Sequence, residues 1–413
     1  MNTRMLGQRS WVPTGPMLAS LSQRVALGFG GHVRTGRLDV ILQDGSRRTF
    51  GDPSAELRAE IRVHDSEAFV RLLLGGATGA GEAYMDGLWS SPDLARVLEL
   101  GARNRRLAAT SGGWWRAPAR WRRSMVHRAR QNTRIGSRRN IAAHYDLGND
   151  FYRLFLDETM TYSSAVFASP DQSLPDAQRN KYRLMAERAG LTGGEQVLEI
   201  GTGWGGFALY AAGELGCRVT TITVSRAQQE LAQTRIRDAG LGHLVTVRLQ
   251  DYRDVTGTYD AIVSIEMLEA VGPEFHATFF EACDRVLRPG GRLSLQSITY
   301  PEPEYQAQIR GVNWVQQYIF PGGVLPSLAA IERAIGRTEL LITDVADIGE
   351  HYVPTLRAWR TRFMEQLDAV RAQGFDDRFV RMWEYYLAIS EAGFNVGMTQ
   401  DLQIAFQKGR SRR

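Results

Sequence analysis

The stretch VLEIGTGWGGFAL (197–209) decides the fold prediction. Its apolar first half carries Glu199 near its end, and glycines then stand at every second position, at Gly201, Gly203 and Gly205, before a second apolar segment. Glycine is required where a backbone turns sharply and a ligand lies against it without a Cβ atom in the way. We therefore predict a buried strand, a glycine-rich binding loop and a helix.

The sequence around this loop alternates strand-like and helix-like segments. Five apolar, β-branched runs are typical of buried strands: 195–200, 218–224, 245–250, 259–265 and 291–298. Helical patterns separate them, for example over 226–240 and 274–287. Such alternation indicates βαβ units and a parallel sheet with helices on both faces.

Glu199, which precedes the loop, distinguishes between a dinucleotide and an amino-acid ligand. Gly201, Gly203 and Gly206 also fit the G-x-G-x-x-G spacing of dinucleotide sites. The carboxylate of Glu199 would repel a pyrophosphate, but it suits the ammonium group of an amino-acid moiety. An acidic residue followed by G-x-G-x-G after a strand is the signature of S-adenosylmethionine (SAM) methyltransferases. We predict SAM as the cofactor and an α/β, Rossmann-like class I SAM-dependent methyltransferase domain.

Further cofactor-binding candidates follow the other predicted strands. The second strand ends at Thr223 and Val224, with Gln228 one turn into the next helix, and hydroxyl and amide groups can bind a ribose or the methionine end. Ser225 is as well explained as a helix cap. The third strand leads to Asp251 and Tyr252, expected near the adenine, with capping as the alternative for Asp251. The fourth predicted strand ends at Ile265, which we also predict to contact the cofactor.

We divide the 413 residues into three parts: a small N-terminal α+β domain over 1–102, a connector over 103–139, and the methyltransferase domain over 140–413. The first part contains a predicted hairpin over 37–50, a strand over 55–63, and helices over 64–74 and 91–102, the last capped by Ser91. No apolar run is long enough to span a membrane. The first residues lack the apolar core of a secretory signal. Two distant cysteines give no metal or disulfide pattern, and no metal is expected.

The connector is strongly basic. Residues 101–145 contain 12 arginines and no acidic residue, so they make an otherwise acidic chain basic, with a net charge of +5. Trp114, Trp115 and Trp121 stand among these arginines. Arginine and tryptophan together suit an anionic membrane surface; a solvated linker and a nucleic-acid contact are the alternatives. No nucleic-acid-binding signature accompanies the segment, so no nucleic-acid partner is expected.

Several motifs in order resemble one family. They are HYDLGNDFYRLFLDETMTYSSAVF (144–167), LEIGTGWGGFALYAA (198–212), TVSRAQQE (223–230), QDYRD (250–254), EAVG (269–272) and YIFPGGVLPS (318–327). Together they are similar to the cyclopropane-fatty-acyl-phospholipid synthases and mycolic acid cyclopropane synthases, over roughly 140–407. The segment 81–94 is similar to the small N-terminal domain of the family.

The resemblance implies roles for individual residues. Tyr162 and Ser163 match cofactor-binding positions, as do Gly201, Gly203, Thr223, Gln228 and Tyr252. Glu269 matches a glutamate that binds bicarbonate beside the reacting carbon. Ile298 contributes its backbone there, and Tyr352 completes the site. The implied cofactors are therefore SAM and bicarbonate.

The sequence departs from the family at the bicarbonate site. Ser164 stands in place of the usual cysteine, Gln296 in place of histidine, and Ala270 follows Glu269 where histidine is usual. The expected reaction adds a one-carbon unit to an acyl double bond through a carbocation, and a base then removes a proton. The expected product is a cyclopropane chain. The alternative is a methylene branch formed from the same cation, which a separate reductase would convert to methyl.

The expected partners are unsaturated phospholipids at an anionic membrane surface. We expect a cytoplasmic protein attached peripherally to the inner face of the membrane. A monomer and a homodimer are both compatible with the sequence. Two other classes compete: a nucleic-acid or small-molecule methyltransferase, which would need a motif such as N-P-P-Y after the fourth strand, and a lipid-binding relative without catalysis. The intact Glu199, Gly201, Gly203 and Glu269 argue against the second.

Overall fold

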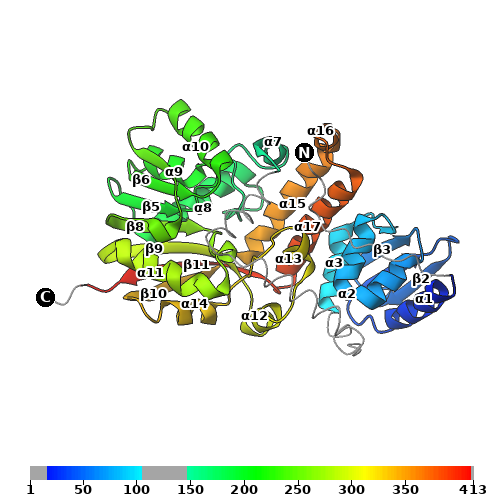
Figure 1. The fold of residues 1–413 in the computed structure, drawn as a ribbon. Helices are drawn as coiled ribbons and strands as arrows, with labels where there is room; N and C mark the ends of the chain where they lie inside the picture. Colours follow the sequence, from blue (N-terminus) through cyan, green and yellow to red (C-terminus); the bar gives the residue numbers. More distant parts are fainter. Residues whose placement is uncertain (1–15, 105–146, 411–413) are drawn as a thin grey trace. The chain divides into compact units, whose positions relative to one another are not determined.

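The computed structural model describes residues 16–104 and 147–410, and these fall into two compact units (Figure 1). Within the described residues, unit 1 consists of 16–104, 311–319 and 367–396, and unit 2 consists of 147–310, 320–366 and 397–410. The predicted connector, 103–139, lies almost wholly outside the described residues, so that boundary stays a prediction.

Unit 1 contains a four-stranded sheet in the order β2-β1-β3-β4. Its elements are α1 (Pro16–Gly30), β1 (Arg37–Ile41), β2 (Arg47–Gly51), β3 (Arg58–Val63), α2 (Glu67–Met85), β4 (Trp89–Ser90), α3 (Leu94–Arg103), α13 (Trp314–Tyr318), α16 (Leu367–Ala372) and α17 (Asp377–Asn395). The predicted hairpin is present as antiparallel β1 and β2, and β3 pairs with β1 in parallel. The prediction that Ser91 caps α3 was wrong, because the helix begins at Leu94. The cap is Asp93, whose side chain accepts a hydrogen bond from the Arg96 backbone N–H at 3.3 Å.

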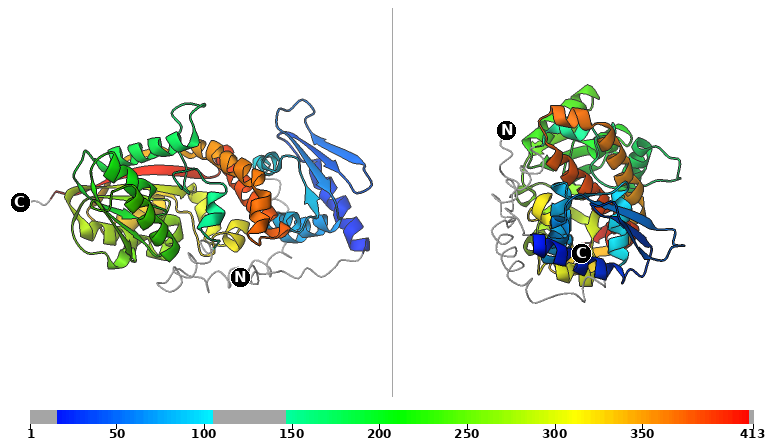
Figure 2. Two further views of the ribbon diagram at one scale, coloured as in Figure 1. Left: turned by 90° about the horizontal axis from the view of Figure 1, so that it is seen from above. Right: turned by 90° about the vertical axis from the view of Figure 1, so that its right-hand side faces the viewer.

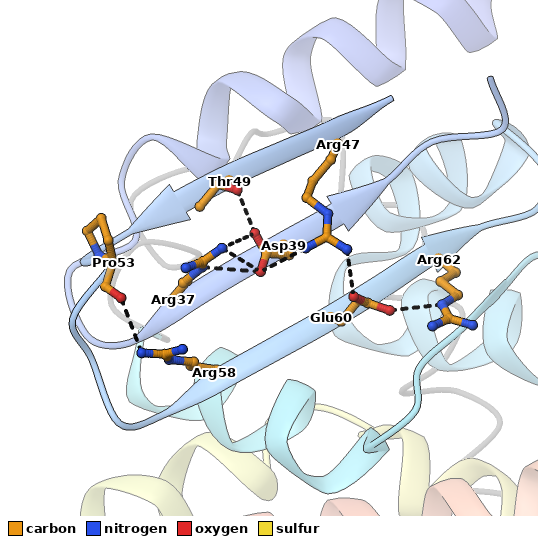
Figure 3. A network of polar contacts seen from close by, with 8 residues as sticks. All are labelled: Arg37, Asp39, Arg47, Thr49, Pro53, Arg58, Glu60 and Arg62. Carbon is orange, nitrogen blue, oxygen red and sulfur yellow. Dashed lines mark hydrogen bonds and ion pairs between the residues drawn. The ribbon is translucent and has the colours of Figure 1, made fainter. Parts of the chain in front are cut away.

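Charged side chains form ion pairs within β1 and between β2 and β3, which flank it (Figure 3). Asp39 on β1 pairs with Arg37 at 3.1 Å and accepts the Thr49 hydroxyl from β2. Arg47 then pairs with Glu60 on β3 at 3.3 Å. Such partly exposed pairs stabilise a fold only slightly, by about 0–1 kcal/mol each, so we assign them to strand register rather than to a binding site.

Two late segments of the chain belong to unit 1 rather than to the methyltransferase unit. The helix α17 packs on α2, where the Tyr84 hydroxyl donates to Glu384 at 2.6 Å. The Trp314 and Tyr385 rings lie 4.7 Å apart, and a Cβ atom at Gly81 would meet the Trp314 ring at 2.7 Å. Local sequence patterns predict such helices but not the unit that they join.

Unit 2 holds the predicted α/β core. Its helices are α7 (Asn149–Arg153), α8 (Leu174–Ala189), α9 (Gly206–Gly213), α10 (Arg226–Asp238), α11 (His276–Val286), α12 (Glu302–Gln308), α14 (Leu328–Ile335), α15 (Gly349–Glu365) and the short 3₁₀ turns η3 (Tyr252–Asp254), η4 (Leu268–Ala270) and η5 (Pro273–Phe275). Its strands are β5 (Gln196–Ile200), β6 (Arg218–Thr223), β7 (Val245–Leu249), β8 (Tyr259–Ile265), β9 (Leu287–Thr299), β10 (Leu340–Asp347) and β11 (Gln400–Lys408).

The seven strands form one sheet in the order β10-β11-β9-β8-β5-β6-β7. Of the described strands in this sheet, β11 is the one that runs antiparallel to its neighbours, β9 and β10. The sheet is therefore mainly parallel, as predicted. The five predicted strands are present, whereas β10 and β11 were not predicted; Figure 2 shows β11, in red, lying within this sheet.

Apolar side chains fill both faces of the sheet. On β5, Val197 packs in a core with α8, α9 and α10, and Leu198 packs in the opposite core with α11 and α14. This alternation follows from the two-residue period of a strand that is covered on both sides. Because β5, β6 and β8 run parallel to one another, the loops that follow them lie at one edge of the sheet.

The described residues contain no helix with the length and apolar character needed to cross a membrane.

Candidate functional site

A cavity with about 1140 Å³ of empty space, part of it open to solvent, lies at the carboxyl ends of β5, β6, β7 and β8. Ligands in open α/β sheets bind at this edge. Most of the predicted cofactor residues line the cavity: Tyr162, Ser163, Glu199, Gly201, Gly203, Thr223, Val224, Gln228, Asp251, Tyr252 and Ile265. Residues that were not predicted also line it, among them Lys181, Trp204 and Glu266.

The glycine loop has the backbone that its sequence predicts. Gly201 and Gly203 have φ angles of +101° and +51°, in the region that favours glycine. A Cβ atom at Gly203 would meet no atom within 4 Å, so this position opens onto the cavity. Gly205, which we predicted at the cofactor, does not line the cavity. Its φ of +87° and a Cβ position 3.3 Å from Ala232 show that it lets α9 approach α10.

Glu199 lies at the end of β5 and is 3% exposed. Burial raises the pKa of its carboxyl to about 8, although Lys181 opposes this rise. Within the described residues, its Oε2 atom is buried without a hydrogen-bond partner. A buried acceptor at a cavity wall is the environment that an ammonium group would satisfy.

Lys181, on α8, is fully buried below the same cavity. Its Nζ atom donates to the Ser163 hydroxyl at 2.7 Å. Burial lowers the pKa of this ammonium to about 8, and the attraction of carboxylates such as Glu266 and Asp401 limits the fall. Lys181 therefore links the predicted cofactor residue Ser163 to the acidic groups behind it.

The polar residues after β6 are connected to one another. The Thr223 hydroxyl donates to Gln228 Oε1 at 2.8 Å, which orients the Gln228 amide. The Ser225 hydroxyl caps α10 by accepting a hydrogen bond from the backbone N–H of Gln228 at 3.3 Å. The capping role that we considered for Ser225 is thus present, while Thr223 and Gln228 remain at the cavity wall.

The Asp251 side chain also has a local role. Both of its carboxylate oxygens accept from the Arg253 guanidinium, at 2.8 and 2.6 Å, and it caps η3. The Arg253 guanidinium lies over the Tyr252 ring, and the Phe279 ring is 5.5 Å from that of Tyr252. The alternative that we considered for Asp251, a helix cap, is present in the structure, and both residues still line the cavity. Their contact with an adenine stays a prediction.

Aromatic rings form another part of the wall. The Tyr162 ring lies 5.3 Å from both Tyr152 and Trp359, and Trp204 lies 4.9 Å from Tyr152. Trp204 is fixed by a hydrogen bond from its indole nitrogen to Asn149 at 2.8 Å. Rings held in this way exclude water and offer π faces to a cation.

The predicted catalytic residues divide between two glutamates. Glu266, which sequence reasoning missed, accepts from the Ser164 amide at 2.8 Å, from Gln296 Nε2 at 2.9 Å and from the Tyr352 hydroxyl at 2.7 Å. The Ser164 hydroxyl itself donates to the Ala165 carbonyl. The signal that could have identified Glu266 is its place: a carboxylate immediately after β8, at the ligand-binding edge.

Glu269 forms the second cluster, beside Ile298. Its Oε1 atom accepts from the Ile298 amide and, at 3.0 Å, from the Ser297 hydroxyl. Its Oε2 atom is buried without a hydrogen-bond partner among the described residues. Burial, with the repulsion of Glu266, raises the pKa of Glu269 to about 8. The backbone contribution of Ile298 is therefore directed at Glu269.

These residues fit SAM. The Glu199 carboxyl with its unpartnered oxygen suits the ammonium group, and the open space at Gly203 leaves room for a ligand against the loop. The strand order, the glycine loop after β5 and the cavity at the carboxyl ends define a class I SAM-dependent methyltransferase.

Comparisons with known proteins give the family. The model of the mycolic acid cyclopropane synthetase family matches residues 132–404. The tuberculostearic acid methyltransferase UfaA1 of Mycobacterium tuberculosis is 42% identical in an alignment of 402 residues that covers 94% of this chain and 91% of that protein. The cyclopropane-fatty-acyl-phospholipid synthase of Escherichia coli is 34% identical in an alignment of 367 residues that covers 85% of this chain and 88% of that protein.

A solved structure agrees with these relatives. The mycolic acid cyclopropane synthase CmaA1, complexed with SAH and CTAB, superposes with a TM-score of 0.62 at 30% identity, over 66% of this chain and 98% of that chain. The chain belongs to the mycolic acid cyclopropane synthetase family, and its cofactor is SAM. The predicted family, fold class and SAM cofactor are confirmed, whereas bicarbonate stays a prediction.

Proposed function

We propose that this enzyme transfers a one-carbon unit from SAM to the double bond of an unsaturated phospholipid acyl chain. The observation that carries the proposal is the combination, at one cavity, of aromatic walls and a buried carboxylate cluster around Glu266. Relatives named for fatty-acyl phospholipid and mycolic acid substrates support a lipid substrate.

Each part of the cavity has a task in this reaction. Bound SAM supplies an electrophilic methyl group. When an alkene attacks such a carbon, a positive charge develops on the acyl chain. The rings of Tyr162 and Trp204 keep water from this cation and face it with π electrons. A base at the cavity wall then removes a proton.

Two products can follow from the same cation. The first is cyclopropane, as expected from the sequence. The second is a methylene branch, and two observations favour it: Ser164 and Gln296 differ from the family pattern, and the relative that is 42% identical is named a methyltransferase. Catalytic hydrogenation of the purified lipid distinguishes them, because an exocyclic methylene group is reduced under mild conditions that leave a cyclopropane intact.

The reaction requires access to acyl chains in a bilayer, so we propose peripheral attachment to an anionic membrane surface at the cytoplasmic face. The arginine-rich segment 103–139 supports this attachment by its composition. That segment, with its tryptophans, lies outside the described residues except for residues 103 and 104.

The proposed function predicts that S-adenosylhomocysteine is released with anionic vesicles of a monounsaturated phospholipid. Vesicles of the saturated phospholipid with the same headgroup are the matched control and should give only background release. Equal release with both would show that the double bond is not the acceptor, and release with neither would reject a phospholipid substrate.

A further inference from the structure

The backbone at Glu266 is held in an unusual conformation. Its φ of +48° is in the left-handed region, which non-glycine residues rarely adopt. Among the described residues, Met160 and Glu266 are the two non-glycine residues with positive φ, and both line the cofactor cavity. The Glu266 amide donates to the Gln296 carbonyl at 2.8 Å, which fixes the turn. Strain of this kind persists where the surrounding structure enforces it, often at functional sites.

The Glu266 carboxylate collects donors from three distant segments. The Ser164 amide and Gln296 Nε2 donate to Oε1, and the Tyr352 hydroxyl donates to Oε2. These three residues are among those that the family resemblance assigns to holding bicarbonate, together with Glu269 and Ile298. In this chain, their donors instead hold a carboxylate that the protein supplies itself. Because two donors fill Oε1, we expect Oε2 to take a proton from a substrate.

A relay of side chains determines which way the Gln296 amide faces. The Arg188 guanidinium can only donate, and its Nε atom lies 3.2 Å from Gln403 Oε1. Gln403 Nε2 therefore donates to Gln296 Oε1, at 3.1 Å. As a result, Gln296 Nε2 must face the carboxylates, and it lies 2.9 Å from both Glu266 and Asp401.

Asp401 helps Glu266 to keep its charge. Burial and the neighbouring carboxylates raise the pKa of Asp401 well above its usual range, and its carboxyl shares a hydrogen bond with Glu266. Burial raises the pKa of Glu266 as well, but its three donors and Lys181 oppose this rise. The three donors therefore favour the ionised form of Glu266, while its burial gives that carboxylate a raised proton affinity, as a general base requires.

We propose that Glu266 is the general base of the reaction and acts in place of bicarbonate. The proposal rests on the proposed function, because the proton comes from the carbon transferred to the acyl chain. In the first step, the alkene electron pair forms a bond to that carbon while the carbon–sulfur pair stays on sulfur. A Glu266 oxygen then accepts a proton from the transferred carbon.

The released C–H electron pair completes either product. It closes the third bond of a cyclopropane ring. After a hydride shift to the neighbouring carbon, it instead forms the exocyclic double bond of a methylene group. The base acts on the same carbon in both cases, so its identity does not depend on which product forms. The proton on Glu266 returns to solvent after product release.

The test combines bicarbonate dependence of turnover with direct bicarbonate binding. Wild-type turnover should be the same in carbonate-free buffer and with added bicarbonate. Glu266→Gly, which suits the positive φ, should lose roughly 10²–10⁴-fold in turnover and regain part of it when bicarbonate is added. Glu266→Gln keeps the bulk without the basic group and should be equally slow but not rescued. All three proteins should bind SAM with similar affinity.

The binding readout does not depend on activity. Carbon-13 NMR with labelled bicarbonate should show broadening with Glu266→Gly and none with the wild type. Wild-type turnover that requires bicarbonate, wild-type binding of bicarbonate, or near-normal turnover of a SAM-binding Glu266→Gln would overturn the proposal. If the wild type releases no S-adenosylhomocysteine with unsaturated phospholipid, the proposed function fails instead, and the binding readout still decides whether the carboxylate occupies the anion position.

Discussion

Gly203→Val should abolish SAM binding, with an affinity loss of at least ~10²-fold, while the protein still unfolds in one cooperative transition. The position opens onto the cavity, and a Cβ atom there would meet no protein atom within 4 Å, so a branched side chain would take space that the ligand needs. The φ of +51° adds a backbone cost of about 1–3 kcal/mol. Isothermal titration calorimetry with SAM measures the effect.

Gly216→Val is the matched control for that backbone cost. Gly216 has a φ of +67° and equally open space around its Cβ position, but it does not line the cavity. Its valine variant should lose similar stability and keep SAM affinity. A folded Gly203→Val protein that binds SAM as the wild type does would remove the glycine loop from the site.

Glu199→Gln should weaken SAM binding by roughly 30-fold or more, because losing one partner of a buried charge pair costs about 2–5 kcal/mol. It should also change the pH dependence. The pKa of Glu199 is raised to about 8, so near pH 7 the free protein holds a proton there that the incoming ammonium displaces. Wild-type affinity should therefore fall as pH decreases below 8, by up to about tenfold per pH unit, and binding at pH 7 should release protons.

Calorimetry in buffers with different ionisation enthalpies measures this proton release, which should decrease in Glu199→Gln. Glu195→Gln is the control, because Glu195 immediately precedes the same strand but does not line the cavity. Its carboxylate accepts a hydrogen bond from the Gly193 backbone N–H at 2.8 Å. Proton release by Glu199→Gln equal to that of the wild type would show that the displaced proton belongs to another group.

The sequence predicted the parts of the fold that depend on local pattern. The strand before Gly201 and the glycine loop follow from apolar periodicity and from the need for positive φ, and both are present. The position of β11 could not be predicted in this way, because it inserts antiparallel between β9 and β10 through contacts between distant segments. Likewise, no local pattern shows that α17 packs in unit 1.

The same distinction explains the site. Tyr162, Glu199 and Gly203 were predicted from motifs and line the cavity. Glu266 was missed although SIEMLEAVG (264–272) contains it, because its meaning depends on Ser164, Gln296 and Tyr352, which lie far apart in the sequence. The resemblance assigns those three residues to a bicarbonate ion, and in the structure all three donate hydrogen bonds to the Glu266 carboxyl group.

During turnover, the carbon transferred from SAM should lose a proton at this site while it becomes part of an acyl chain. Turnover with SAM whose transferred methyl group carries three deuterium atoms, followed by mass spectrometry of the phospholipid, measures this loss. The phospholipid product should retain two of the three deuterium atoms, whether it is a cyclopropane or a methylene chain. A product that retains all three, or no labelled phospholipid, would contradict this mechanism.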